Sequence, residues 1–329
     1  MLVQPNWMRV AQEMDYKLPV EASRWQLPLT LPASHSIERH LYSAADVTVV
    51  IPVKDDPSGL SETLQALNAL HGGIRPARVI VVDDGSGDAG AATSVEVCKA
   101  SEAGLVVEAC VQLVNQGPAA ARNRGAEMAT TQWLWFLDAG VRPDTEFLVA
   151  LMEHGHICPA VAWTGPIASD STGLFASYYS AQSILSPPAQ PDGQLDGFVT
   201  ASVVINRSAF ETVGGFDGRF RRAACEDLDL GLRLRPHGLI GYAADLLVRH
   251  RFREDEGDFR RRFRRYGYGF FQFGAKWQRN MEPWPVVARI DDPVHRQLAG
   301  IQYEELWNGW KEAQAADEAA RSQDASLLF

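Results

Sequence analysis

The 329-residue sequence has no run of about 20 apolar residues, so no segment is predicted to cross a bilayer. Its first ten residues include Gln4, Pro5 and Arg9 and do not form the apolar core of a signal peptide. Cysteine is scarce: the four cysteines form no C-x-x-C pair and no zinc-type spacing. We therefore expect a cytoplasmic protein with reduced cysteines. It could also bind peripherally to the inner face of a membrane.

Basic residues are fewer than acidic ones, 31 against 41, which gives a net charge of −10. A general nucleic-acid-binding protein would need the opposite balance, so no nucleic-acid partner is expected. No G-x-G-x-x-G follows the first apolar run, which disfavours a dinucleotide-dependent oxidoreductase. Apolar residues make up 46% and charged residues 22%, the proportions of a globular protein with a sizeable core.

Short apolar runs alternate with helical spacing from residue 46 onward. Strands are predicted at 47–51, 78–82, within 105–114 and at 133–137, and helices at 60–70, 89–103, 118–128 and from Pro143. Such β-α alternation predicts an α/β fold with a mainly parallel sheet flanked by helices.

The second half of the sequence is less regular. Residues 165–197 are rich in Ser, Gly and Pro and are predicted to be a long loop. A strand is predicted at 198–205, a helix at 226–235 and a strand within 239–248.

Three parts are expected along the chain: an N-terminal extension at 1–45, a main domain at 46–255 and a helical C-terminal extension at 256–329. The extension at 1–45 is dotted with prolines and carries Trp7 and Trp25. These tryptophans and the aromatic residues of the C-terminal extension could form a contact between subunits, so the chain could assemble as a homo-oligomer.

Four carboxylates, Asp55, Asp83, Asp84 and Asp138, fall just after predicted strands. In sheets of this kind, ligands gather beyond the carboxyl ends of the strands. Asp83 and Asp84 could accept hydrogen bonds from a nucleobase or a ribose, or could simply cap the next helix. Asp138 could bind Mg²⁺ or Mn²⁺ beside a diphosphate, or could be an ordinary turn residue.

Two further positions carry candidate chemistry. Glu226 and Asp227 open an amphipathic helix, where acidic residues favour the helix dipole. The alternative is a general base, because a carboxylate beside another ionised carboxylate has a raised pKa. His250 follows an apolar run, and a lone histidine is more often structural than a metal ligand.

Six segments, in this order, resemble the family 2 glycosyltransferases with the GT-A fold. The segments are TVVIPV at 48–53, VVDDGS at 81–86, NQGPAAARN at 115–123, WFLDA at 135–139, GGFD at 214–217 and EDLDLGLRL at 226–234. Together they cover roughly residues 46 to 252.

The resemblance implies a sugar donor carried on a nucleoside diphosphate, usually UDP or GDP. Asp84 would bind the base, with Asp83 close by, and Arg122 would face the nucleoside or the phosphates. The segment containing Pro52, Val53 and Asp55 would flank the nucleoside.

The resemblance also implies the catalytic residues. Asp227 matches the base that deprotonates an acceptor hydroxyl, which then attacks the anomeric carbon with inversion; Glu226 would help to place the base or contact the acceptor. Asp138 matches the first position of a D-x-D motif for Mn²⁺ or Mg²⁺, and His250 matches a metal-binding histidine of some members.

One departure concerns the D-x-D motif, because Gly140 stands where the second Asp is usual. Three explanations remain. The metal could be held by Asp138, His250, the diphosphate and water; cationic side chains could neutralise the leaving group without metal; or the protein could have lost catalysis and serve as a nucleotide-sugar-binding partner subunit.

An arginine-rich stretch follows the matched segments. Eight arginines (Arg249, Arg251, Arg253, Arg260, Arg261, Arg262, Arg264 and Arg265) and four acidic residues give it a local charge of +4. It could clamp a diphosphate or touch an anionic lipid or acceptor, or it could be a helix face paired to the acidic body. The aromatic residues from Tyr266 to Trp277 are expected to pack in a core.

The sequence thus predicts a glycosyltransferase that uses a nucleoside-diphosphate sugar. The acceptor could be a saccharide, a lipid, a peptide or a small metabolite.

Overall fold

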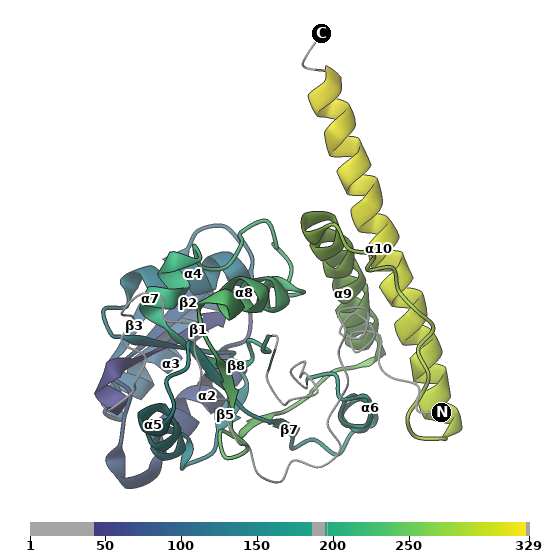
Figure 1. Ribbon diagram of the computed structural model, residues 1–329. Coiled ribbons are helices and arrows are strands. Elements are labelled where there is room, and N and C mark those ends of the chain that lie inside the picture. The colour runs from purple at the N-terminus through teal and green to yellow at the C-terminus, as the bar shows by residue number, and fades with distance from the viewer. Residues whose placement is uncertain (1–42, 186–194, 196, 327–329) are drawn as a thin grey trace.

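The computed structural model describes residues 43–185, 195 and 197–326. Buried apolar strands form a seven-stranded sheet in the order β3-β2-β1-β4-β8-β6-β9 (Figure 1). Their bounds are β1 (Val47–Val53), β2 (Arg78–Asp84), β3 (Val107–Gln112), β4 (Trp133–Leu137), β6 (Ala162–Thr164), β8 (Ser202–Asn206) and β9 (Ile240–Tyr242). The strands β1 to β4 are parallel, and β8 runs antiparallel to both β4 and β6. The predicted mixed, mainly parallel α/β sheet is confirmed.

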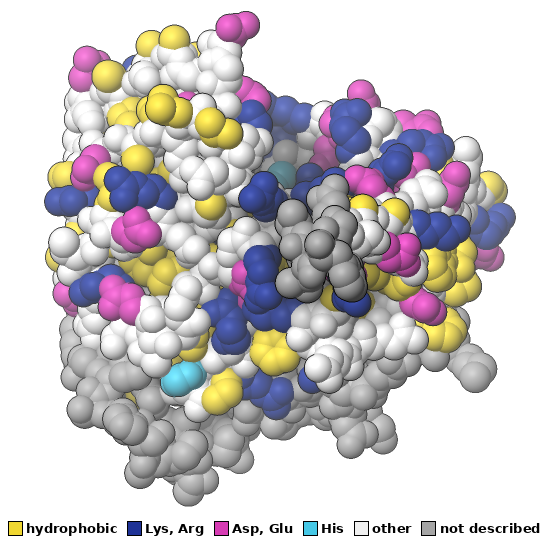
Figure 2. Space-filling view, turned by 90° about the horizontal axis from the view of Figure 1, so that it is seen from above, with side chains coloured by type: hydrophobic (Ala, Val, Ile, Leu, Met, Phe, Trp, Pro, Cys, Tyr) yellow, Lys and Arg dark blue, Asp and Glu magenta, His cyan; other side chains and the backbone are white. Residues whose placement is uncertain are grey.

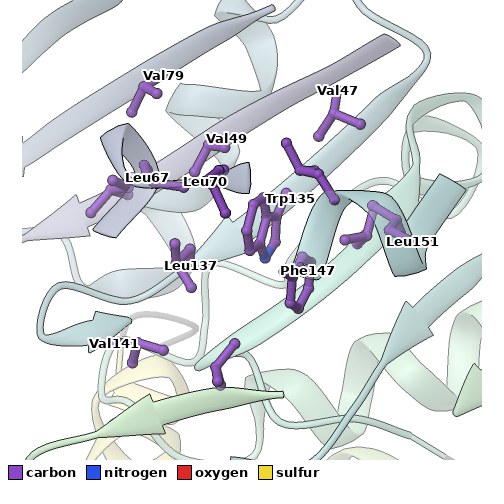
Figure 3. Packing of buried hydrophobic residues seen from close by; sticks show 14 of the residues in the cluster. Val47, Val49, Leu67, Leu70, Val79, Trp135, Leu137, Val141, Phe147 and Leu151 are labelled. Atoms are coloured by element: carbon purple, nitrogen blue, oxygen red, sulfur yellow. The ribbon is translucent and has the colours of Figure 1, made fainter. Parts of the chain in front are cut away.

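Helices cover both faces of this sheet, because alternate residues of a strand point to opposite sides. One core contains Val49 and Ile51 of β1 together with side chains of α2 (Pro57–Asn68), α3 (Gly90–Glu102) and α5 (Phe147–Ile157). In this core Trp135 stacks on Phe147, with ring centroids 4.2 Å apart (Figure 3). The other core contains Val50 together with side chains of α4 (Pro118–Met128), α7 (Arg207–Thr212) and α8 (Glu226–Leu234).

A second, three-stranded sheet has the order β5-β10-β7. It consists of β5 (Val141–Pro143), β7 (Ile167–Ser169) and β10 (Val248–His250). His250 pairs with Val141, three residues after Asp138. This sheet therefore brings a late segment of the chain beside the loop that follows β4.

The remaining helices form a separate layer beside the sheet (Figure 1). They are α6 (Leu174–Gln182), α9 (Glu256–Trp277) and α10 (Pro293–Ser326), and the C-terminal part of α10 extends past the end of α9. Phe259 and Phe263 of α9 pack with Tyr178 and Tyr179 of α6, while Phe273 lies in a smaller core with Phe220. Short 3-10 turns occupy η1 (Ala44–Asp46), η2 (His71–Gly73) and η3 (Arg235–His237).

The structure corrects three details of the sequence prediction. Pro143 ends β5 instead of starting a helix; α5 begins at Phe147, after a turn in which Phe147 N–H donates to Asp144 O (3.1 Å). The predicted loop at 165–197 contains β7 and α6, whose tyrosines supply buried packing. The single strand expected within 239–248 is replaced by β9 and β10, which belong to different sheets.

Other expectations are not decided by the fold. Nearly all of the predicted extension at 1–45, including Trp7 and Trp25, lies outside the described residues. The division at residue 255 stays a prediction, although α9 begins at Glu256. Among the described helices, none is both long and apolar enough to span a bilayer.

Candidate active site

The carboxyl end of β1 lies where the order of the parallel strands reverses. Pairing between β1 and β4 ends at Val50 with Phe136, whereas pairing between β1 and β2 continues to Val53 with Asp83. Pro52 of β1 comes after the last residue of β1 that pairs with β4. Because proline has no N–H, it suits a position without a strand partner on that side. A crevice at such a reversal is the usual ligand position in open α/β sheets.

Two loops at this end of the sheet bind each other. Asp55 N–H donates to Ser86 Oγ (2.8 Å), and Gly87 N–H donates to Asp55 Oδ1 (3.1 Å). The exposed Asp55 also accepts a hydrogen bond from Lys54 Nζ (2.8 Å), which lowers the pKa of the carboxyl. Asp55 therefore joins the loops after β1 and β2.

Asp83 and Asp84 are the last two residues of β2, and both carboxylates bind backbone amides. Asp83 Oδ1 accepts from Ser86 N–H (2.7 Å). Asp84 accepts from Gln116 N–H (2.8 Å) and Gly117 N–H (2.9 Å), so it fixes the turn before α4. The predicted contact between Asp84 and a nucleobase stays a prediction.

Gly117 occupies a position that a larger residue would not fit. Its φ of +93° lies in the region that favours glycine, and a Cβ atom built on it would lie 2.2 Å from the carbonyl oxygen of Arg221. The segment that leads into α8 therefore rests directly on the start of α4.

Arg122 of α4 joins two of the predicted site carboxylates. Its Nη2 donates to Asp138 Oδ1 (2.7 Å), and its Nη1 donates to Glu226 Oε1 (3.0 Å). The side chains of Arg122 and Glu226 are only 3% and 4% exposed, whereas Asp138 is 33% exposed. Burial alone would lower the pKa of Arg122, but the two carboxylates outweigh it and raise the pKa. The predicted contact of Arg122 with a nucleoside or phosphate stays a prediction.

Asp227 is the neighbour of Glu226 in the first turn of α8. Burial, and next the charge of Glu226, raise the pKa of Asp227 to about 7, against the opposing effect of the Leu228 N–H. Burial likewise raises the pKa of Glu226, although Arg122 opposes this. A carboxyl group with a pKa near the working pH is suited to act as a general base.

His250 lies at the end of β10 and stacks on Phe252, with ring centroids 4.4 Å apart. Burial, followed by the charge of Arg262, lowers the pKa of His250, while Asp138 acts in the opposite direction. Its buried Nδ1 has no hydrogen-bond partner among the described residues. A neutral imidazole with an unused nitrogen fits a metal ligand.

The described residues contain no group of three or more His, Cys, Asp and Glu side chains that could hold a metal ion. Asp138 and His250 would therefore need the donor diphosphate and water to complete the coordination. Gly140 has a φ of +82°, and its N–H donates to Gly59 O (2.9 Å). Glycine adopts such a backbone conformation readily.

The arginine-rich stretch is mostly paired within the protein. Six of its eight arginines form ion pairs with carboxylates: Arg251, Arg253, Arg260, Arg261, Arg262 and Arg264. Figure 2 shows basic and acidic side chains lying next to one another on the face seen from above, with Lys and Arg gathered beside a hollow. Three of these pairs lie within the stretch itself, and the others reach α2 or α10.

Sequence reasoning missed the role of Asp229, two residues after Asp227. Its side chain is fully buried and binds cations from α8 and α9. The signal was an acidic residue between Leu228 and Leu230, in a stretch that was otherwise interpreted only by its apolar pattern.

Similarity to known proteins identifies the relatives of this chain. The family described as "Glycosyl transferase family 2" matches residues 48–214, and "Glycosyl transferase family group 2" matches residues 148–291. A pre-mycofactocin glycosyltransferase from Mycobacterium tuberculosis is 36% identical over 235 residues, covering 68% of this chain and 47% of the relative. A validoxylamine A glucosyltransferase from Streptomyces hygroscopicus subsp. limoneus is 26% identical over 259 residues, covering 68% of this chain and 56% of the relative. The chain spans about half the length of these relatives.

Two solved structures share the fold. The mannosyltransferase PcManGT from Pyrobaculum calidifontis, in complex with GDP-Man and Mn²⁺, has a TM-score of 0.54 and 17% identity, covering 88% of this chain and 83% of that protein. TarS 1-349 from S. aureus, in complex with UDP, has a TM-score of 0.51 and 16% identity, covering 68% and 65%. The predicted GT-A fold is confirmed.

Proposed function

Because the chain belongs to glycosyltransferase family 2, we propose that it transfers a sugar from a nucleoside-diphosphate donor to an acceptor hydroxyl, with inversion at the anomeric carbon. The observation that carries the proposal is Arg122, which joins Asp138 of the donor side to Glu226, the neighbour of the candidate base. Carboxylates 88 residues apart in the sequence (226 − 138) thus share one cation.

The donor nucleotide would lie at the carboxyl ends of β1, β2 and β4. The residues proposed to line this position are Pro52, Val53, Asp55, Asp83, Asp84, Arg122 and Asp138. Solved proteins of the same fold are named as complexes with UDP and with GDP-Man, which supports a donor of the UDP or GDP type.

In the proposed reaction, Asp227 removes the proton from the acceptor hydroxyl as its oxygen attacks the anomeric carbon. The bond between that carbon and the phosphate oxygen breaks, and the nucleoside diphosphate leaves with the bonding electrons. A single displacement of this kind inverts the configuration. A pKa of about 7 leaves Asp227 substantially ionised at neutral pH and still basic enough to accept a proton. Glu226, held by Arg122, would place the base.

Asp138 and His250 are the residues proposed to hold a divalent cation. When bound, Mn²⁺ or Mg²⁺ would neutralise charge that develops on the leaving diphosphate. The unused Nδ1 and the lowered pKa of His250 support its assignment as a ligand in the neutral form.

The donor and acceptor can be identified by a substrate screen. Purified protein with Mn²⁺ would be incubated with UDP- and GDP-linked sugars and with saccharide, lipid, peptide and metabolite acceptors, and products would be read by mass spectrometry. The names of the two relatives justify including pre-mycofactocin and validoxylamine A in the panel.

Variants then test the assignment of the base. Asp227→Asn is expected to abolish transfer and to leave nucleotide binding largely intact. Asp245→Asn is the matched control, because Asp245 is an exposed carboxylate paired with His154. Normal transfer by Asp227→Asn would show that Asp227 is not the base.

Gly140 favours one alternative, a nucleotide-sugar-binding subunit without catalysis, because the second D-x-D carboxylate is missing. Calorimetry with UDP, with and without Mn²⁺, combined with a donor-hydrolysis assay, distinguishes the two functions. Tight binding without turnover of any donor would favour the binding subunit.

A further inference from the structure

A buried ionic network joins the helix that carries Glu226 and Asp227 to the C-terminal helices. Its centre is Asp229 of α8, whose side chain is 0% exposed. Asp229 Oδ2 accepts from Arg233 Nε (3.0 Å) and Nη2 (2.7 Å). Asp229 Oδ1 accepts from Trp277 Nε1 (3.0 Å) and forms an ion pair with Lys276. Both of these donors lie in the last turn of α9.

Lys276 also reaches a second carboxylate. Its Nζ donates to Asp217 Oδ2 (2.8 Å), and Asp217 additionally pairs with Arg219. Arg219, together with Lys276, holds the pKa of Asp217 well below its usual range. Lys276 is therefore the cation that connects α8, α9 and the turn at 214–217.

The same network continues to the candidate active site. Arg233 Nη1 donates to the carbonyl oxygens of Val213 (2.7 Å) and Gly215 (2.6 Å), which fixes both sides of that turn. The next residue, Phe216, lies beneath the guanidinium of Arg122, 5.6 Å from its ring centroid. A displacement of α8 or of this turn would therefore act on Arg122 and on the carboxylates that it binds.

The helix α8 depends on side-chain contacts with neighbouring elements, among them the ion pair of Glu226 with Arg122. It has only nine residues, and its N-cap, Cys225, makes no capping hydrogen bond through its side chain. Cys225 also has a left-handed backbone with φ of +66°, a conformation that surrounding contacts must hold in place.

We propose that Lys276 and Trp277 are positioning residues that hold α8, and with it Asp227 and Glu226, in the geometry required for transfer. The inference rests on the proposed function for its catalytic consequence. Both residues lie outside the segment 48–214 that one family comparison matches and inside the segment 148–291 that the other matches. The C-terminal extension would then support the chemistry by holding α8 in place.

Removal of Lys276 should leave a folded protein. Without it, Asp229 keeps two hydrogen bonds from Arg233, and Asp217 keeps its ion pair with Arg219. Each carboxylate therefore retains a cation. The change removes the bonds of Lys276 to Asp229 and Asp217, while Trp277 still donates to Asp229.

The test compares Lys276→Met and Trp277→Phe with Arg264→Met. Arg264 is the matched control, because it pairs with Glu312 of α10, and Glu312 keeps its ion pair with Arg222 when Arg264 is replaced. We expect Lys276→Met to lower kcat by about ten- to a hundredfold with KM for the donor little changed, since a misplacement near 1 Å can cost that much. Trp277→Phe should show a smaller loss, Arg264→Met no loss, and Lys276→Arg partial recovery.

A second measurement does not depend on activity. Hydrogen exchange of the α8 amides should be about tenfold faster in Lys276→Met than in the native protein, and unchanged in Arg264→Met. Unchanged α8 exchange in Lys276→Met would overturn the proposal, as would a normal kcat. If α8 exchange is faster in Lys276→Met but the native protein transfers no sugar, the link between the helices is supported and the proposed function is refuted.

Discussion

Replacement of Asp227 by Asn should make the protein more stable at pH 8 while it abolishes transfer. The pKa of Asp227 is raised from 3.8 to about 7, chiefly by burial and then by the charge of Glu226. The folded state therefore binds this proton more tightly than the unfolded state. Protonation of Asp227 therefore contributes to the free energy of unfolding. This contribution is fully present below about pH 4 and is lost as the pH rises through 7.

The size of the effect follows from the shift. Each pKa unit corresponds to about 1.4 kcal/mol, so a shift of about three units makes ionised Asp227 cost up to roughly 4 kcal/mol above pH 7. Asn has a similar shape and cannot ionise, so the variant avoids this cost. At pH 5 the expected difference is less than half as large, because Asp227 is then mostly protonated in the folded state.

Urea unfolding at pH 5 and pH 8 measures this difference directly. Asp227→Asn should exceed the native protein in free energy of unfolding at both values, and more so at pH 8. Glu127→Gln, which removes an exposed carboxylate paired with Arg124, should show no such trend. The prediction would be refuted if the difference in free energy of unfolding did not change with pH, or if the variant were less stable than the native protein at pH 8. Either result would show that burial does not raise the pKa of Asp227.

Four other substitutions test the geometry of the site. Glu226→Gln removes the like charge beside Asp227, so the acid limb of the pH–kcat/KM profile should move to lower pH; a limb that stays in place contradicts the coupling. Arg122→Met leaves two carboxylates without their cation and should cost about 3–5 kcal/mol in urea unfolding. Asp84→Asn puts an amide opposite two backbone N–H donors and should cost about 1–3 kcal/mol by the same method. Gly117→Ala should lower the melting temperature, because its Cβ would overlap a carbonyl oxygen; an unchanged value would contradict the close approach.

The fold was largely predictable because its signals are local. The β-branched run at 47–51 could be buried on both faces only in a sheet covered by helices, and β1 is buried in this way. The carboxylates after the first strands could be placed at one edge of the sheet for the same reason. These predictions needed only the period of the apolar residues and the parallel direction of the strands.

The partners of the charged residues were not predictable, because they depend on segments distant in the sequence. Arg122 was predicted to face the donor, but nothing in the sequence indicated that it also binds Asp138 and Glu226. The arginines after residue 249 were open to several interpretations until their carboxylate partners were known. Composition gives the number of charges, but only the packing decides which of them remain available.

The helix α6 was missed for a different reason. Ser, Gly and Pro dominate the region around it, and its own nine residues give little amphipathic signal. Tyr178 and Tyr179 are held there by the aromatic side chains of α9, so tertiary contacts stabilise a helix that its local sequence does not.

The position of β4 between β1 and β8 has a consequence for the newly made chain. As the protein leaves the ribosome, β1 to β4 can assemble early, but the second edge of β4 stays open until residues 202–206 have been synthesised. Arg122 and Asp138 likewise wait for Glu226, so an unfinished chain presents a bare apolar edge beside an incomplete charge cluster. Translation that stalls within this interval is expected to yield nascent chains that aggregate.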